Sequence, residues 1–378
     1  MELGPDSAWS FACATVAEED AKPKIRRGGS SFCCSERRSV AIPSRASTRS
    51  VFTATERRRY NIIFSNTVKE NLTLADLQNW KKSRPPIRLG VFGQAVAHSL
   101  SPPMHNAALQ ESGLAMQYAR FAIAPEELKT ALELLLPLDF VGMNLTVPHK
   151  VAALAFVHDV DDAAAEMGAI NTIKCEDGKL RGFNTDGRGF ARAIREEFAV
   201  DLRDLRILIL GAGGAARAIA WQCAKENCER LVVANRDVGK AAALVEELRP
   251  LFAGPRVLGP VARLQAVALQ EAALRFQIAN SDLVVNATPL GRNRNDPLPV
   301  PARLLEPHLM IYDIVYSTGP TGLVSGAIEA GARAANGQSM LLHQGALAFE
   351  IWFDRAAPID KMRIALRAAA TDPAAGND

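Results

Sequence analysis

A lysine and an aspartate stand at two points where the chain is expected to pass from a strand into a helix. Lys150 closes the segment NLTVPHK (144–150), and Asp186 lies within NTDG (184–187). Pro148 is expected to start a helix, which puts Lys150 in the first turn, against the positive end of the helix dipole. An amine and a carboxylate so placed could transfer a proton as a pair. The residues alone also allow a surface lysine and an N-capping aspartate, and they do not bring the two together.

A glycine-rich turn offers a second kind of chemistry. Residues 211–216, GAGGAA, follow an apolar strand and open a helix. Gly211 permits the tight turn, Gly213 lets the backbone approach a pyrophosphate, and Ala216 is small enough for close packing of helix on strand. The N–H groups at the helix start favour phosphate. We therefore predict that residues 207–217 bind a dinucleotide, the alternative being a turn without a ligand.

The end of the next strand bears on which dinucleotide is bound. Asn235 and Arg236 follow its apolar residues, and Lys240 comes one helical turn later. An acid at this point would bond a ribose 2′-hydroxyl, whereas cations suit a 2′-phosphate. The two cations favour NADP, while the adjacent Asp237 weakens that preference. The alternative is that both cations are solvated surface charges.

Two hydroxyls precede another predicted helix. Ser99 and Ser101 flank Leu100, Pro102 suits the first helical turn, and Gly113 suits the exit. Hydroxyls at the positive end of a helix could hold a carboxylate. From these residues alone, a plain N-cap is the favoured interpretation of Ser101.

Predicted strands and helices, which must position these groups, alternate along the chain from about residue 86. This alternation indicates an α/β protein. Apolar runs predict strands at 87–92, 118–123 and 139–145, and a hairpin of 170–175 with 179–183 turned by Asp177 and Gly178. Later strands are expected at 206–210, 231–234, 282–286 and 310–315. The polar stretch 201–204 divides a first domain at 85–200 from a Rossmann domain at 201–335, and 378 residues suit two domains.

Composition excludes several classes of function. Residues 1–60 hold 11 Lys and Arg against 7 Asp and Glu, whereas the remainder holds 33 against 34. The remainder therefore has no basic footprint for nucleic acid, and no apolar run reaches membrane-span length. The six cysteines form no CxxC pair and lack nearby histidines, so we expect reduced thiols, no metal site and a cytoplasmic protein. Residues 1–60 are interpreted as a disordered extension or a mis-assigned start, since their acidic residues count against a transit peptide.

Together these motifs resemble the shikimate dehydrogenase family, in the same order across residues 87–353. The segments that carry the resemblance are HSLSP (98–102) with HN (105–106), NLTVPHK (144–150), GAINT (168–172), NTDG (184–187), GAGGA (211–215), NR (235–236), NATPLG (286–291), DIVY (313–316) and MLLHQ (340–344). Each segment alone is weak evidence, but the ordered set is highly specific.

The resemblance implies roles for these residues. Lys150 and Asp186 become the catalytic pair of a reversible, NADPH-dependent reduction of 3-dehydroshikimate to shikimate, a step of chorismate and aromatic amino acid biosynthesis. The implied substrate contacts are Ser99, Ser101, Asn144, Thr146, Asn171, Thr185, Tyr316 and Gln344. The implied cofactor contacts are Gly211, Ala212, Gly213, Gly214, Ala215, Asn235, Arg236, Lys240, Thr288 and Gly337. Helices at about 336–370 would return to the first domain, and the site would lie between the domains.

Five positions depart from the family pattern. Ala95, His149 and Thr318 concern loop stiffness, whereas Arg292 and Asp237 bear on the nicotinamide pocket and the cofactor preference. The nearest alternative is a relative that acts on quinate, or on both compounds, with NAD or NADP. A remoter one is a nucleotide-binding sensor without turnover, which the intact Lys150 and Asp186 argue against. The sequence leaves the oligomeric state open, a homodimer included.

Overall fold

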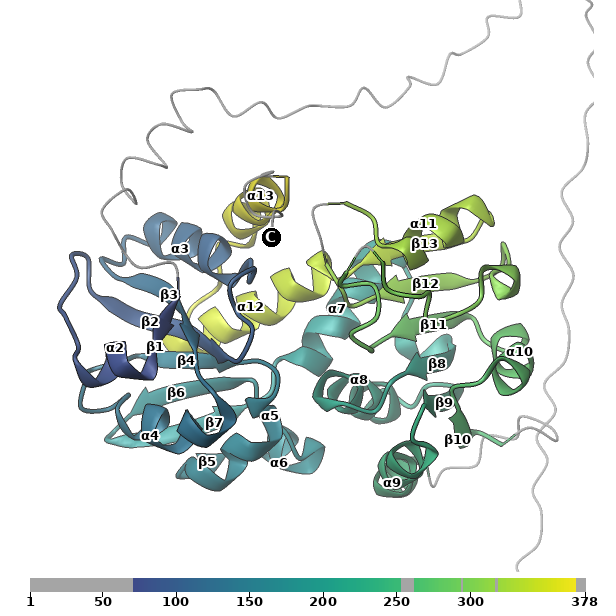
Figure 1. Cartoon of the computed structure of the whole chain (residues 1–378), viewed down its shortest axis with the longest axis horizontal. Helices are drawn as coiled ribbons and strands as arrows, with labels where there is room; N and C mark the ends of the chain where they lie inside the picture. The colour runs from purple at the N-terminus through teal and green to yellow at the C-terminus, as the bar shows by residue number, and fades with distance from the viewer. Residues whose placement is uncertain (1–70, 253–261, 294, 317–318, 372–378) are drawn as a thin grey trace, which may run out of the picture. The chain divides into compact units, whose positions relative to one another are not determined.

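The computed structural model describes residues 71–252, 262–293, 295–316 and 319–371, which build two lobes around two β-sheets (Figure 1). The extension at 1–60 and the departure at Thr318 lie outside these residues. The arrangement agrees with the predicted α/β class. Within the described residues, no helix is long and apolar enough to cross a membrane.

The first lobe is built on a seven-stranded mixed sheet. Its spatial order is β1 (Leu72–Thr73), β3 (Gln117–Ala122), β2 (Ile87–Gly93), β4 (Gly142–Leu145), β6 (Thr172–Glu176), β7 (Lys179–Phe183) and β5 (Asp159–Val160). The pairs from β1 to β4 are parallel, and β6 runs antiparallel to both β4 and β7. Asp177 and Gly178, with φ of 50° and 71°, turn the β6–β7 hairpin as predicted. The pairing of β4 with β6 places Asn144, the first residue of the NLTVPHK motif, opposite Thr172, the last residue of the GAINT motif.

The helices of this lobe are short apart from one. They are α2 (Leu74–Gln78), α3 (Ser101–Glu111), α4 (Leu128–Glu133), α5 (His149–Ala152) and α6 (Asp162–Met167), with 3₁₀ turns at Pro125–Glu127 and Ala153–Phe156. Helix α5 begins one residue later than predicted, with Pro148 in the N-cap position, and Lys150 still lies in its single turn. Helix α3 has Leu100 in the N-cap position, so Ser101 is its first residue and not its cap.

The second lobe contains a six-stranded, fully parallel sheet. Its order is β10 (Leu264–Ala268), β9 (Arg230–Asn235), β8 (Arg206–Leu210), β11 (Leu283–Asn286), β12 (Met310–Asp313) and β13 (Arg333–Asn336). Counted along the chain this is 3-2-1-4-5-6, the order of a dinucleotide-binding Rossmann fold. The direction of winding reverses between β8 and β11, so a ligand crevice is expected at the carboxyl ends of those two strands.

Helices cover both faces of this sheet and link it to the first lobe. They are α7 (Asp186–Phe198), α8 (Gly214–Lys225), α9 (Val238–Leu248), α10 (Glu271–Ala279), α11 (Gly322–Glu329), α12 (Gln338–Phe353) and α13 (Ile359–Ala370), with 3₁₀ turns at Leu202–Asp204, Arg249–Phe252 and Ala302–Leu304. Helix α12 packs along α7, and α13 packs on α3, so the carboxyl end of the chain contacts the first lobe (Figure 1).

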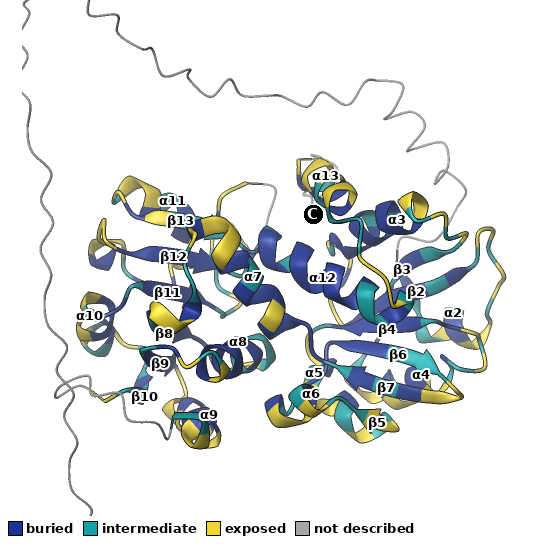
Figure 2. Ribbon diagram, turned by 180° about the vertical axis from the view of Figure 1, so that it is seen from behind, coloured by how far each residue is buried: buried dark blue, intermediate teal, exposed yellow. Residues whose placement is uncertain are grey.

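Helix α7 passes from the first lobe into the core of the second. Phe190 and Ile194, both fully buried, pack in one apolar cluster with Ile207 of β8 and Tyr312 of β12. A Cβ on Gly189 would lie 2.8 Å from the backbone N of Gln344, so the missing side chain allows α7 and α12 to approach closely. In Figure 2 the ribbon of α12 is mostly dark blue, as expected for a helix enclosed by both lobes.

Candidate active site

Lys150 and Asp186 meet at the junction of the lobes. The Lys150 Nζ donates to Asp186 Oδ2 at 2.5 Å, and their side chains are 14% and 6% exposed. Asp186 is the first residue of α7, but its carboxylate does not cap the helix: the backbone N–H of Asp186 donates instead to Asn184 Oδ1 at 3.0 Å. The fold thus joins two groups 36 positions apart. A buried ammonium–carboxylate pair can hold and transfer a proton.

Asn171 and Thr185 complete the surroundings of the aspartate. The Asn171 Nδ2 donates to Asp186 Oδ1 and to Thr185 Oγ1, both at 2.9 Å. Each oxygen of the carboxylate therefore has one donor, Asn171 on Oδ1 and Lys150 on Oδ2. Both carboxylate oxygens are thus occupied as acceptors, so Lys150 is the group of the pair that can offer a proton to a ligand.

Gln344 reaches the same group from α12. Its Oε1 lies 3.5 Å from Asn171 Nδ2, at the limit of a hydrogen bond, and its Nε2 donates to the Leu341 carbonyl at 2.8 Å. Thr146 follows β4 and is held by its backbone, which donates to the Phe92 carbonyl and accepts from His149. The hydroxyl of Thr146 forms no hydrogen bond with any residue that the structure describes, so it is available to a ligand.

Ser99, Ser101 and Tyr316 come together at one place. Ser99 Oγ accepts from the backbone N–H of Ser101 at 3.3 Å, so Ser99, not Ser101, takes part in capping α3. The Tyr316 side chain lies beside Ser99 and the backbone of Leu100, and burial raises the pKa of its phenol. Tyr316 follows β12 of the second lobe, yet it packs on an apolar cluster of the first. Segments from both lobes thus supply these hydroxyls.

The glycine-rich turn has the form that a dinucleotide site requires. Gly211 has φ of +111°, and a Cβ there would lie 2.8 Å from the Ala287 carbonyl oxygen, so only glycine fits. At Gly213 a Cβ would meet nothing within 4 Å, which leaves open space beside the start of α8. Gly214, the first residue of α8, faces Lys150, whose Cβ lies 3.6 Å from the position of an added Cβ. The start of α8, which is predicted to bind phosphate, therefore adjoins the lysine.

Arg236, Asp237 and Lys240 surround the start of α9 and are all exposed. Asp237 caps α9: its carboxylate accepts from the backbone N–H groups of Gly239 at 3.0 Å and Lys240 at 3.4 Å. Asn235 Nδ2 donates to the Asp237 carbonyl at 3.0 Å. Within the described parts of the chain, neither the Arg236 guanidinium nor the Lys240 ammonium forms an ion pair. Both cations are free to meet a phosphate, and the Asp237 carboxylate points toward the helix start.

In this structure Thr288 and Gly337 contact neighbouring backbone groups. Thr288 Oγ1 donates to Asn286 Oδ1 at 2.7 Å and accepts from the Leu290 N–H, which shapes the loop after β11. Asn286 also donates to Asp313, a buried carboxylate whose pKa is raised by desolvation. Gly337 precedes α12, where a Cβ would overlap the Ile314 carbonyl. The structure places Thr288 beside the cofactor turn through Ala287 and shows no contact of Gly337 with that turn.

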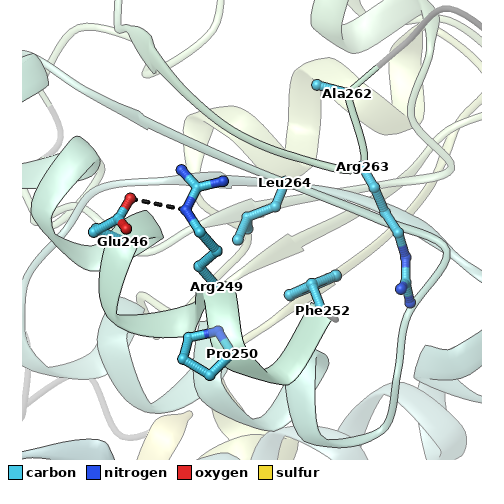
Figure 3. Close-up of a pocket in the computed structure, with 7 residues that line it drawn as sticks. All are labelled: Glu246, Arg249, Pro250, Phe252, Ala262, Arg263 and Leu264. Carbon is cyan, nitrogen blue, oxygen red and sulfur yellow. Dashed lines mark hydrogen bonds and ion pairs between the residues drawn. The ribbon is translucent and has the colours of Figure 1, made fainter. Parts of the chain in front are cut away.

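Other features of the described residues lie outside this site. Among them no cluster of three histidine, cysteine, aspartate or glutamate side chains could hold a metal. A hollow of about 590 Å³ opens between the end of α9 and the start of β10, with the Arg249–Glu246 ion pair at its edge (Figure 3). It contains none of the predicted site residues.

Models of known families match three segments of the chain. The shikimate dehydrogenase substrate binding domain matches residues 91–173, shikimate/quinate 5-dehydrogenase matches 192–289, and the shikimate 5′-dehydrogenase C-terminal domain matches 337–367. A shikimate dehydrogenase (NADP⁺) of Methanopyrus kandleri is 42% identical over 280 residues, covering 74% of this chain and 94% of the relative. The chain belongs to the shikimate dehydrogenase family. This confirms the resemblance inferred from the ordered motifs.

Two solved structures of relatives, a shikimate dehydrogenase and a quinate dehydrogenase, are similar to this chain. The shikimate 5-dehydrogenase of Thermus thermophilus in complex with NADP(H) and shikimate is 36% identical, with a TM-score of 0.65 over 75% of this chain and 99% of the other. The quinate dehydrogenase of Corynebacterium glutamicum in complex with NAD is 29% identical, with a TM-score of 0.66 over 75% and 99%. The fold thus occurs in dehydrogenases of shikimate and of quinate, and with NADP or NAD bound. The preference for one substrate or cofactor therefore depends on particular residues.

Proposed function

We propose that this chain is an NADP-dependent shikimate dehydrogenase that interconverts 3-dehydroshikimate and shikimate. The observation that carries the proposal is the enclosed Lys150–Asp186 pair, with Asn171 bonded to the second carboxylate oxygen. The relatives named as shikimate dehydrogenase (NADP⁺) support the same activity.

Reduction of the C3 ketone adds a hydride to carbon and a proton to oxygen. NADPH supplies the hydride when bound. The Lys150 ammonium donates the proton to the oxygen as the alkoxide forms, and in the oxidative direction the neutral amine takes it back. Asp186 accepts a hydrogen bond from Lys150 and orients the amine.

The substrate is proposed to lie with its carboxylate at Ser99, Ser101 and Tyr316. Its ring hydroxyls then meet polar groups of the first lobe and of α12, namely Asn144, Thr146, Asn171, Thr185, Asp186 and Gln344. A site built from hydroxyl and amide groups rejects analogues that lack a hydroxyl, because its buried polar atoms would be left unpaired. Residues 85–200 with 336–370 are thereby the substrate domain, and 201–335 the cofactor domain.

The residues proposed to hold the cofactor fit a phosphorylated dinucleotide. Gly211 to Ala215 offer a backbone without obstructing side chains, and the start of α8 supplies N–H groups for the pyrophosphate. Arg236 and Lys240 would bind the 2′-phosphate, with Asn235 shaping the turn between them. Thr288 and Gly337 complete the proposed contacts. We also propose a cytoplasmic enzyme, which imaging of a labelled full-length chain would test, and a homodimer, which sedimentation would test.

The absorbance of reduced nicotinamide tests the proposal directly. Full-length protein is incubated with shikimate or with quinate, each with NADP⁺ or NAD⁺. We expect the highest kcat/KM for shikimate with NADP⁺. Absence of turnover with all four pairings would leave a nucleotide-binding protein without this activity, and faster turnover of quinate would assign the chain to the alternative substrate, which the relative of Corynebacterium glutamicum represents.

A further inference from the structure

Tyr118 lies behind the site and was not singled out from the sequence. It stands in β3, is 2% exposed, and donates from its hydroxyl to Asn144 Oδ1 at 2.8 Å. Burial raises the pKa of its phenol well above the usual value. The ring stacks on the buried His105, with centroids 4.5 Å apart and planes within 9°. Tyr118 is therefore a neutral phenol held in one orientation.

The hydroxyl of Tyr118 begins a chain of buried hydrogen bonds. Asn144 Nδ2 donates to Thr172 Oγ1 at 3.0 Å, and Thr172 Oγ1 donates to Asn171 Oδ1 at 2.9 Å. Asn171 Nδ2 then donates to Asp186 Oδ1 at 2.9 Å. Every step runs from donor to acceptor in one direction, from the phenol to the carboxylate.

Two backbone groups determine this direction. The N–H of Thr185 can only donate, and it points to Asn171 Oδ1 at 2.8 Å. The carbonyl of Asn171 can only accept, and Asn144 Nδ2 lies 3.2 Å from it. Together they set which end of each amide is oxygen and which is nitrogen. Both hydrogens of the Asn144 amide are donated inside the protein, so its oxygen can be satisfied only by a donor such as Tyr118.

We propose that Tyr118 is a positioning residue for the reaction: its hydroxyl orients Asn144, and through Thr172 and Asn171 it holds the Asp186 carboxylate against Lys150. The inference rests on the proposed roles of Lys150 and Asp186. Hydrogen bonds that run in one direction polarise one another, by roughly 10–30% per bond. Without the phenol, Asn144 Oδ1 is buried without a donor, and rotation of the amide to relieve this takes the donor away from Thr172.

The test replaces Tyr118 with phenylalanine, which keeps the ring and its stacking on His105. Tyr312→Phe is the matched control: Tyr312 is also fully buried and its hydroxyl bonds Ser339 and the Met340 N–H, but this network does not reach Asp186. We expect Tyr118→Phe to lower kcat about tenfold, as for loss of one buried hydrogen bond. The KM for NADPH is expected to stay unchanged, and Tyr312→Phe to keep kcat within about twofold, although both variants lose comparable stability.

A second variant tests whether Tyr118 acts through this series of hydrogen bonds. Thr172→Val removes the hydroxyl that links Asn144 to Asn171 and keeps the shape of the side chain. If Tyr118 acts in series, the double variant has the same kcat as the more affected single variant; if the two residues act independently, their effects multiply. Multiplying effects, or a kcat loss no larger than that of Tyr312→Phe, would overturn the inference.

The outcome is separable from that of the proposed function. Absence of wild-type turnover with every substrate and cofactor pairing would refute the proposed function first. The series of hydrogen bonds from Tyr118 to Asp186 would still be tested by urea unfolding of the same variants. Residues linked by one hydrogen-bond network show non-additive losses of stability. If the losses of unfolding free energy in Tyr118→Phe and Thr172→Val are strictly additive, the two residues are not linked by one series of hydrogen bonds.

Discussion

Replacing Asp237 with serine is expected to strengthen the binding of NADPH and to leave that of NADH unchanged. Asp237 caps α9 through the Gly239 and Lys240 N–H groups, and serine preserves an N-cap acceptor, so the helix start should keep its geometry. The substitution removes one negative charge beside Arg236 and Lys240, the two cations proposed to bind the 2′-phosphate.

The size of the effect follows from the exposure of the site. All three side chains are exposed, so the dielectric constant is close to that of water. At a separation assumed to be roughly 7 Å, a carboxylate in water repels a phosphate of charge about −1.5 to −2 by about 1 kcal/mol. Its removal should lower the Kd for NADPH about fivefold. The gain should shrink as salt is added, because exposed charges are screened.

Fluorescence titration of the full-length protein with NADPH and with NADH measures both constants. Asp204→Ser is the control, since Asp204 is exposed and lies before β8, at the end of the strand opposite to Gly211. An equal gain for NADH would refute the reasoning, because NADH has no 2′-phosphate to repel. A gain of the same size in Asp204→Ser would show a general charge effect instead.

Three further outcomes are expected. Lys150→Ala should lower kcat by about 100-fold or more with little change in KM, as for lost proton transfer, and an unchanged kcat would remove Lys150 from its role. Burial lowers the pKa of His105 from 6.5 to about 3, so the unfolded chain binds more protons between these values and stability falls as the pH falls through that window. His105→Phe should therefore weaken the pH dependence of urea unfolding, and an unaltered dependence would contradict this. Deleting residues 1–60 should leave kcat/KM unchanged in the nicotinamide assay, because the family models match only between residues 91 and 367.

Local signals of the sequence predicted much of the fold. Asp177 and Gly178 adopt the left-handed conformation that their hairpin turn requires. Gly211 likewise has the positive φ that its turn demands. Each of these features depends on the backbone of a few neighbouring residues, so the residue types alone indicate them.

Other features depend on contacts across the fold. The strand at Leu264–Ala268 was not predicted, since its five residues follow the segment 253–261 and gain their partner only from β9. Ser101 was interpreted as a helix cap, but the helix begins at Ser101 itself and Ser99 supplies the acceptor. The role inferred for Tyr118 depends on bonds to residues 26 or more positions away. No local pattern distinguishes such a tyrosine from an ordinary core residue of a strand.

The attachment of the site to both lobes has a consequence for motion between them. Lys150 and Asn171 belong to the first lobe, whereas Asp186 begins α7, whose residues Phe190 and Ile194 pack in the core of the second lobe. The end of α8 that is proposed to bind phosphate adjoins Lys150 at Gly214. A rotation of the second lobe that carried α7 with it would therefore change the distance between Asp186 and Lys150 as well as the approach of the cofactor to the site.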